Sequence, residues 1–302
     1  MVSAMVILLS LVFFYVDYHG DESPGSMPSS VNFVDLSTNY PSEHLNNLKD
    51  VDLLETIKEV DSYRVEEMMR KSRDYRVLYE DLVRSGSPKA RFYAQDILGR
   101  CFSIRRRGLH EVVAVSTQQE SARMLQQERC GSFSSEEVSF DALRQVGVDP
   151  RFSVGLAEIK EEWSKAGSDK TRQKQVFEQV LQANDALLLQ YIGAGLLSQQ
   201  RESIRWGDVE FNGESALDSM RLAWMAAVCE GTGTDCGAGD AYVVDACASL
   251  NLCEESRRLA LRALVARKHG QIQQSNFDTA HALFVKAIQS RNVQIFFPET
   301  TP

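Results

Sequence analysis

The stretch that decides the fold is ALDSMRLAWMAAVCEGTGTDCGAGDAYVVDACASLNLC, residues 216–253. On both sides of its glycine-rich middle, apolar side chains recur at steps of three and four residues, the spacing of one face of an α-helix. They are Leu217, Met220, Trp224, Ala227 and Val228 on the first side, and Val243, Ala246, Cys247 and Leu250 on the second. The spacing predicts two helices joined by a turn.

The glycine-rich middle, CEGTGTDCGAGD at residues 229–240, invites comparison with phosphate-binding loops. A dinucleotide-binding fingerprint needs Gly-x-Gly-x-x-Gly after a strand, but Cys236 stands at the third glycine position and the preceding segment has helical spacing. A Walker A loop would end in Gly-Lys-Ser/Thr, whereas Gly239 is followed by Asp240, whose carboxylate repels phosphate. The sequence therefore predicts no nucleotide and no cofactor.

A turn between helices explains the same residues physically. Helices commonly end at a glycine of positive φ, a role open to Gly231 or Gly233. Gly239 or Asp240 can then begin the second helix. We therefore interpret the glycines as turn residues and not as ligand-binding residues.

Six cysteines predict disulfides, since an even number is typical of exported chains. If the two helices are antiparallel, Cys247 lies roughly 12 Å along the second helix from the turn that holds Cys229. Bridged cysteines need Cα atoms within about 7 Å of each other, which disfavours that pair. The expected pairs are Cys229–Cys236, Cys247–Cys253 and, by elimination, Cys101–Cys130.

Helical spacing continues through most of the chain. In KARFYAQDILGRC, Ser87 is the expected N-cap, Pro88 starts the first turn, and one face carries Ala90, Ala94, Ile97, Leu98 and Cys101. A second face carries Phe277, Ala280, Phe284, Ala287 and Ile288. Residues 176–197 predict a core helix interrupted at Asn184 and Asp185.

Strand signals are few, with short extended pieces expected only at residues 110–116 and 206–213. About nine helices joined by short polar turns are the economical interpretation. The predicted fold is all-α: consecutive antiparallel helix pairs in an irregular, helical-repeat-like array stapled by disulfides.

Two segments, SGSPKARFYAQDILGRC and AWMAAVCEGTGTDCGAGDAYVVDACASLNLC, resemble the helical hairpins of tetratricopeptide-like repeat proteins. More narrowly, they resemble uncharacterised exported bacterial helical proteins with paired cysteines. The resemblance covers about forty residues near the C-terminus and about thirty around Cys101. It implies a helical scaffold and carries no catalytic residue.

The first sixteen residues, MVSAMVILLSLVFFYV, contain no charged side chain and would span roughly 24 Å as a helix. They predict a membrane anchor or signal segment at residues 1–18, in contact with the membrane through residues 2–16. No Ala-x-Ala cleavage site follows, which favours an uncleaved anchor. Secretion after signal cleavage is the alternative.

Three further segments complete the predicted organisation. Proline, glycine, serine and asparagine dominate residues 19–46, as in a flexible polar linker. Residues 47–298 form the helical domain, and residues 299–302 a disordered tail. With the anchor and the cysteines, this organisation predicts a single-pass inner-membrane protein whose helical domain lies in the periplasm.

The net charge of -9 argues against nucleic-acid binding, which needs a basic face. The histidines and cysteines show no metal-ligand spacing, so no metal site is predicted. Other proteins or cell-envelope components are the expected partners. Trp206, in a polar turn region, is the candidate contact residue, whereas Trp224 lies on a core face.

These features predict a non-catalytic, membrane-anchored helical scaffold or interaction protein. The alternative is a peptidoglycan-acting enzyme of lytic transglycosylase type, in which a single glutamate serves as general acid and base. Glu120 in QES and Glu202 in RES are similar to the Glu-Ser pair of that family.

Overall fold

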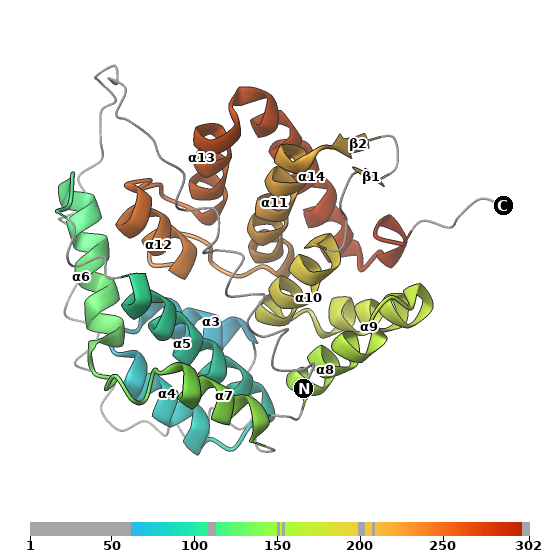
Figure 1. Ribbon diagram of the computed structural model, residues 1–302. Helices are drawn as coiled ribbons and strands as arrows, with labels where there is room; N and C mark the ends of the chain where they lie inside the picture. The colour runs from blue at the N-terminus through green and yellow to red at the C-terminus, as the bar shows by residue number, and fades with distance from the viewer. Residues whose placement is uncertain are drawn as a thin grey trace.

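Figure 1 shows the computed structural model, which describes residues 62–107, 113–149, 152, 155–198, 203–206 and 209–297. The predicted anchor, linker and tail lie outside these residues, as does the first part of the predicted helical domain. Within the described residues, no helix is both long and apolar enough to cross a membrane.

Helices dominate the described residues, which confirms the all-α prediction. In chain order the elements are α3 (Ser62–Lys71), α4 (Tyr75–Arg84), α5 (Pro88–Arg107), α6 (Thr117–Gly131), α7 (Phe140–Val148), α8 (Leu156–Ala166), α9 (Lys170–Ala183), α10 (Ala186–Ser198), β1 (Ser203–Trp206), β2 (Val209–Asn212), α11 (Glu214–Thr232), α12 (Ala241–Leu250), α13 (Arg257–His269), α14 (Gln271–Ser290) and the 3₁₀ turn η4 (Val293–Ile295). The described part thus holds twelve α-helices, more than the nine expected, because several polar segments form short helices.

Of the two extended pieces expected from the sequence, the one at residues 206–213 corresponds to strands in the structure. β1 and β2 form an antiparallel hairpin in which Ile204 lies opposite Phe211, and both side chains are buried. The sequence between them, Gly-Asp, is a two-residue hairpin signal that would have located the pair. No strand is present at residues 113–116, the part of the other expected piece that the structure describes.

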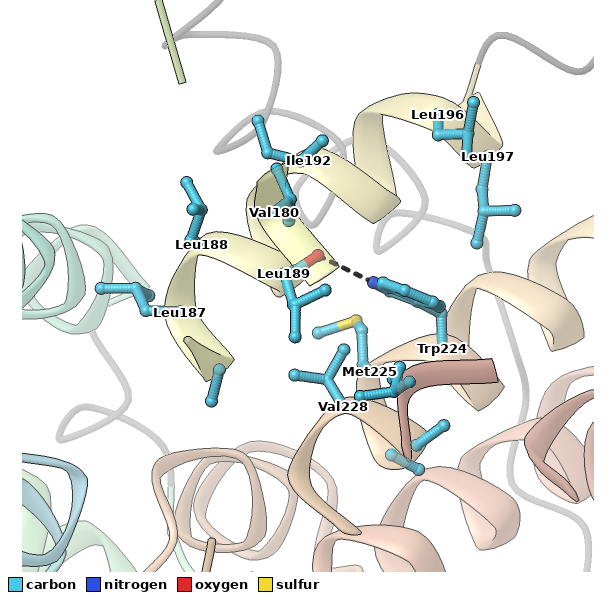
Figure 2. Packing of buried hydrophobic residues seen from close by; sticks show 14 of the residues in the cluster. Val180, Leu187, Leu188, Leu189, Ile192, Leu196, Leu197, Trp224, Met225 and Val228 are labelled. Carbon is cyan, nitrogen blue, oxygen red and sulfur yellow. Dashed lines mark hydrogen bonds between the residues drawn. The ribbon is translucent and has the colours of Figure 1, made fainter. Parts of the chain in front are cut away.

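The core is centred on α11, which lies near the middle of the molecule in Figure 1 and contacts α10, α13 and α14. All five apolar residues expected on its buried face are indeed buried. Trp224 is fully enclosed, and its indole Nε1 donates a hydrogen bond to the Leu189 carbonyl oxygen of α10 at 3.0 Å (Figure 2). Gly193 permits this contact, because a Cβ atom there would lie 2.1 Å from the indole ring.

The expected interruption between α9 and α10 is a helix boundary. Asn184 adopts a left-handed conformation with φ of 47°, which ends α9. Asp185 is buried, and its carboxylate accepts a hydrogen bond from the Leu188 backbone N–H at 2.9 Å. Two residues that disturb an apolar pattern therefore separate two core helices.

Consecutive helices contact each other in pairs, namely α4 with α5, α8 with α9, α10 with α11, and α13 with α14. The most extensive contact, however, joins α11 to α14, and α6 packs on α12 across a long stretch of sequence. In a solenoid each unit contacts only its neighbours. The packing therefore gives no support to a repeat array.

All three disulfides have the expected pairing. Their Cα–Cα distances are 5.3 Å for Cys101–Cys130, 5.9 Å for Cys229–Cys236 and 4.3 Å for Cys247–Cys253. The first joins α5 to α6, and the other two close short segments before and after α12. The cysteines thus staple neighbouring elements and are not ligands.

Candidate functional site: a disulfide-closed turn beneath helix α3

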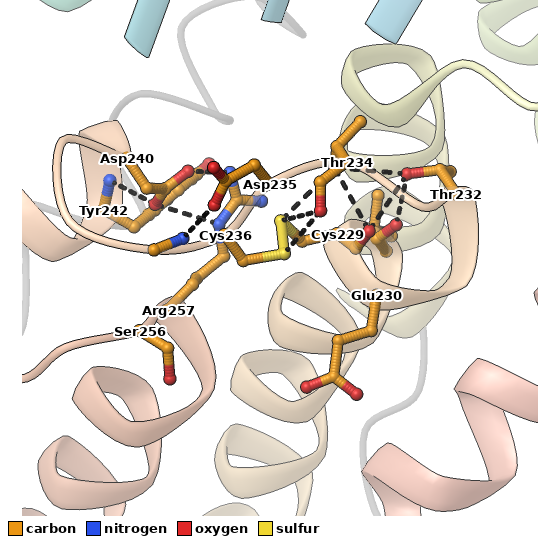
Figure 3. The surroundings of a disulfide bond; sticks show 12 residues. Cys229, Glu230, Thr232, Thr234, Asp235, Cys236, Asp240, Tyr242, Ser256 and Arg257 are labelled. Carbon is orange, nitrogen blue, oxygen red and sulfur yellow. Dashed lines mark hydrogen bonds and ion pairs between the residues drawn. A yellow bond between two sulfur atoms is a disulfide. The ribbon is translucent and has the colours of Figure 1, made fainter. Parts of the chain in front are cut away.

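The turn after α11 is built from glycine geometry and one disulfide (Figure 3). Gly233 ends α11 with a positive φ of 76°, and its N–H bonds back to the carbonyls of Cys229 and Glu230. The chain then returns so that the Thr234 N–H donates to the Cys229 carbonyl at 3.1 Å. Of the two glycines proposed for this role, Gly233 is the one that adopts it.

Gly231 has a different role, which the sequence did not indicate. It lies inside α11, and a Cβ atom there would come within 2.8 Å of the Ile288 side chain on α14. The missing side chain therefore lets α14 approach α11 closely.

Asp240 links the second half of the turn to two helices. As the N-cap of α12, its carboxylate accepts from the backbone N–H groups of Tyr242 and Val243. The same carboxylate accepts from Arg257, the first residue of α13, at 3.0 Å from Nε and 2.5 Å from Nη2. Burial alone would raise the pKa of Asp240, but the Arg257 guanidinium outweighs burial and holds it below the usual value.

Helix α3 docks on this turn. Arg70 Nη2 lies 3.0 Å from Asp235 Oδ2, and a Cβ atom at Gly239 would meet both the side chain and the carbonyl oxygen of Arg70 at 3.2 Å. Gly239 has a φ of 92°, so both its conformation and its close approach to α3 favour glycine. The glycine-rich segment therefore forms part of the surface on which α3 packs, although α3 is far from it in the sequence.

Arg129 of α6 stabilises the contact between α3 and the turn. Its guanidinium is buried and donates to the carbonyl oxygens of Arg70 at 2.7 Å, Ser72 at 3.1 Å and Gly239 at 2.9 Å. It also lies over the Tyr75 ring, 5.3 Å from its centroid. One side chain thus joins α6, the end of α3 and the turn.

A small cavity separates α3 from the helices beneath it. Its volume is about 10 Å³, close to the minimum for one water molecule. Charged and aromatic side chains dominate its lining, which includes Glu66, Arg70, Tyr75, Arg100, Asp240 and Arg257. A cavity of this size does not admit a sugar or a nucleotide.

Glu66 lines this cavity, and its pKa is shifted upward. Burial raises its pKa to about 7, against the opposing effect of Arg257 and Arg100 and with a further rise from Asp96 and Asp240. Another lining group, the buried Nε of Arg70, has no hydrogen-bond partner within the described residues. Glu66 is therefore harder to ionise here than a carboxyl in water.

A second set of polar groups extends the cluster toward α8. Asp96 accepts from Arg100 at 2.5 Å and from the Tyr191 hydroxyl at 3.1 Å. Lys160 Nζ lies 4.1 Å from the centroid of the Tyr191 ring, and burial lowers its pKa to about 8. These residues were not singled out from the sequence, because they come from three helices, α5, α8 and α10, and none belongs to a motif.

The sequence-predicted site residues are dispersed. Glu120 is exposed in the first turn of α6 and does not line the cavity, while Glu202 lies outside the described residues. The backbone of Trp206 pairs with Val209 at the end of the hairpin, and its side chain lies outside the description. The six cysteines meet only in their three pairs.

Within the part of the chain that the structure describes, no group of three or more His, Cys, Asp or Glu side chains is placed to hold a metal ion. Comparisons of the chain with protein-family models, with curated proteins and with solved structures found no match.

Proposed function

We propose that this chain is a non-catalytic helical scaffold or interaction protein, anchored in the inner membrane with its helical domain in the periplasm. The observation that supports it best is the set of three disulfides, since structural disulfides persist in oxidising compartments. The anchor itself is inferred from the uncharged run at residues 2–16. Its partners would be other proteins or envelope components.

The transglycosylase alternative has less support. A catalytic glutamate of that type needs a cleft wide enough for a glycan strand beside it. Glu120 lies on an exposed helix face, and the cavity beside Glu66 is of water size. We therefore favour the scaffold.

Topology provides the first test. Alkaline phosphatase fused after residue 60 or at the C-terminus should be active in a bacterial host, because the enzyme needs an oxidising compartment to form its own disulfides. The matched control lacks residues 1–18 and should give inactive fusions. An inactive phosphatase fusion beside a fluorescent cytosolic fusion would contradict the proposal.

Activity and partner binding provide the second test. The purified full chain should not degrade peptidoglycan, and Glu120→Gln and Glu202→Gln should behave like the wild type. Cross-linking in envelope fractions should capture a partner that Trp206→Ala weakens and Tyr63→Ala, a change at an exposed aromatic on α3, leaves intact. Glycan release abolished by either glutamine variant would establish the enzyme instead.

A further inference from the structure

Helix α6 packs on the domain through a face that is mostly polar. Its buried residues are Gln119, Ala122, Arg123, Gln126, Arg129 and Cys130. Four of these six are glutamine or arginine, whereas Ser219 is the one polar residue among the twelve that α11 buries. The apolar contact between α6 and α12 is small, with Ala122 and the partly buried Leu125 on the side of α6. Burial of apolar surface therefore contributes little to holding α6 on α12.

Side-chain hydrogen bonds join α6 to α12, which lies beside it in Figure 1. Gln119 Nε2 and Arg123 Nε donate to the Ala248 carbonyl oxygen at 3.2 and 3.0 Å. Gln126 Nε2 donates to the Asp245 carboxylate at 2.9 Å. In an open state these groups would bind water instead, so each bond adds little net stability. An interface of this polar kind is typical of contacts that form and break.

The two ends of α6 are held differently. At its C-terminal end, Cys130 is bonded to Cys101 of α5, and Arg129 donates to three carbonyl oxygens of the α3 end and the turn. At its N-terminal end, the Ser116 hydroxyl donates to Asn251 Oδ1 at 2.5 Å. Helix α6 can therefore open from its N-terminal end while the disulfide keeps its other end attached.

The surface of α12 that α6 covers has a defined chemistry. Its centre is apolar and is formed by Val244, Cys247 and Ala248. The groups of α12 and its cap that bind α6 and its cap are all acceptors, namely the Ala248 carbonyl, the Asp245 carboxylate and the Asn251 side-chain oxygen. A helix bound here must therefore supply hydrogen-bond donors on both sides of a small side chain.

We propose that α6 is a displaceable helix, and that its release lets the same surface of α12 bind a partner helix rich in arginine, lysine or glutamine. The partner would carry these donors at the spacing of α6, with a small residue three positions after the first donor and further donors four and seven positions after it. In the chain by itself, α6 occupies the partner's site. This partner class rests on the proposed interaction function, whereas the opening of α6 depends on neither the anchor nor the compartment.

Hydrogen exchange of the full chain in detergent tests the release of α6. Peptides from residues 117–126 should exchange at least about tenfold faster than peptides from α11, because local opening exposes them without global unfolding. Gln126→Ala should raise α6 exchange roughly fivefold, since it removes the bond to Asp245. Gln127→Ala is the matched control, because Gln127 is the exposed neighbour with the same side chain and should leave the exchange unchanged. Equal protection of α6 and α11, or equal effects of the two variants, would refute the release.

A synthetic helix tests the site itself. The probe is a labelled peptide of residues 116–131 with Cys130→Ser and Met124→Lys, its new amine joined to Glu120 by a lactam that stabilises the helix. Positions 120 and 124 are both exposed on α6, so the lactam lies away from α12. Fluorescence anisotropy should show that Gln126→Ala in the chain strengthens peptide binding roughly fivefold, because the competing α6 then leaves the site open more often. Gln127→Ala should bind the peptide as the wild type does.

A second peptide tests the donors. It also carries Gln119→Ala and Arg123→Ala, and should bind at least about tenfold more weakly because both bonds to the Ala248 carbonyl are lost. Equal binding of the two peptides, or no binding of the first to a chain whose α6 opens, would refute the partner site. Neither result would touch the proposed compartment, and glycan release by the chain would overturn the proposed function while leaving both measurements on α6 unchanged.

Discussion

Asp240 and Arg257 form a buried, two-pronged ion pair that joins the start of α12 to the start of α13. The Arg257 backbone N–H also donates to the Cys236 carbonyl oxygen at 2.8 Å, so the same two residues hold the disulfide-closed turn. Both side chains are almost fully enclosed, at 5% and 3% exposure. Water therefore cannot replace either partner.

Asp240→Asn should destabilise the domain by about 3 kcal/mol, because it leaves the buried Arg257 charge uncompensated. Urea unfolding followed by circular dichroism measures the change. Asp81→Asn is the control, since Asp81 pairs with Arg84 on an exposed face and should change stability by less than about 1 kcal/mol. Equal effects of the two substitutions would show that burial of the pair is unimportant.

The loss of stability caused by Asp240→Asn should also depend on pH. The folded-state pKa of Asp240 is lowered, so its stabilisation is complete above the ordinary value of 3.8 and is lost as the pH falls through the lowered one. The stability difference between wild type and variant should therefore be constant from pH 5 to pH 7 and shrink below pH 3.8. A difference that persists unchanged at pH 2 would contradict this assignment.

Gly193→Ala should destabilise the domain by about 3 kcal/mol, because the new methyl group would overlap the Trp224 indole and push it off the Leu189 carbonyl. The matched control is Gly99→Ala in α5, where a Cβ atom meets nothing within 4 Å. There alanine should stabilise by about 0.5–1 kcal/mol through helix propensity. Thermal melts of both variants measure these changes in stability, and tryptophan fluorescence reports on the surroundings of Trp224.

Replacing both Cys101 and Cys130 by serine should cost about 3.6 kcal/mol, from the entropy of a loop of about thirty residues. The equivalent changes at Cys229–Cys236 and Cys247–Cys253 should cost about 2.5 and 2.3 kcal/mol, because their loops are shorter. Melting temperatures of the three double variants test this order. Non-reducing peptide mapping of the wild type checks the pairing, and free thiols there would contradict it.

The sequence by itself determined the all-α class, the turn and the pairing of the cysteines. These are local properties: helical periodicity sets the buried face of α11, Asp240 can cap only the helix that follows it, and short loops favour bridges between nearby cysteines. The interruption at Asn184 and Asp185 is local in the same sense, since a left-handed residue ends a helix wherever it stands.

Only the tertiary structure decided what the glycine-rich turn faces. Gly231 is required by Ile288 and Gly239 by Arg70, contacts that span long stretches of chain and leave no periodic signal. The cluster around Glu66 is likewise assembled from helices that are separate in sequence, and its raised pKa comes from burial, which depends on how those helices pack. The association of α11 with α14, in place of a neighbour-by-neighbour array, has the same origin, because similar apolar faces do not specify which helix each one covers.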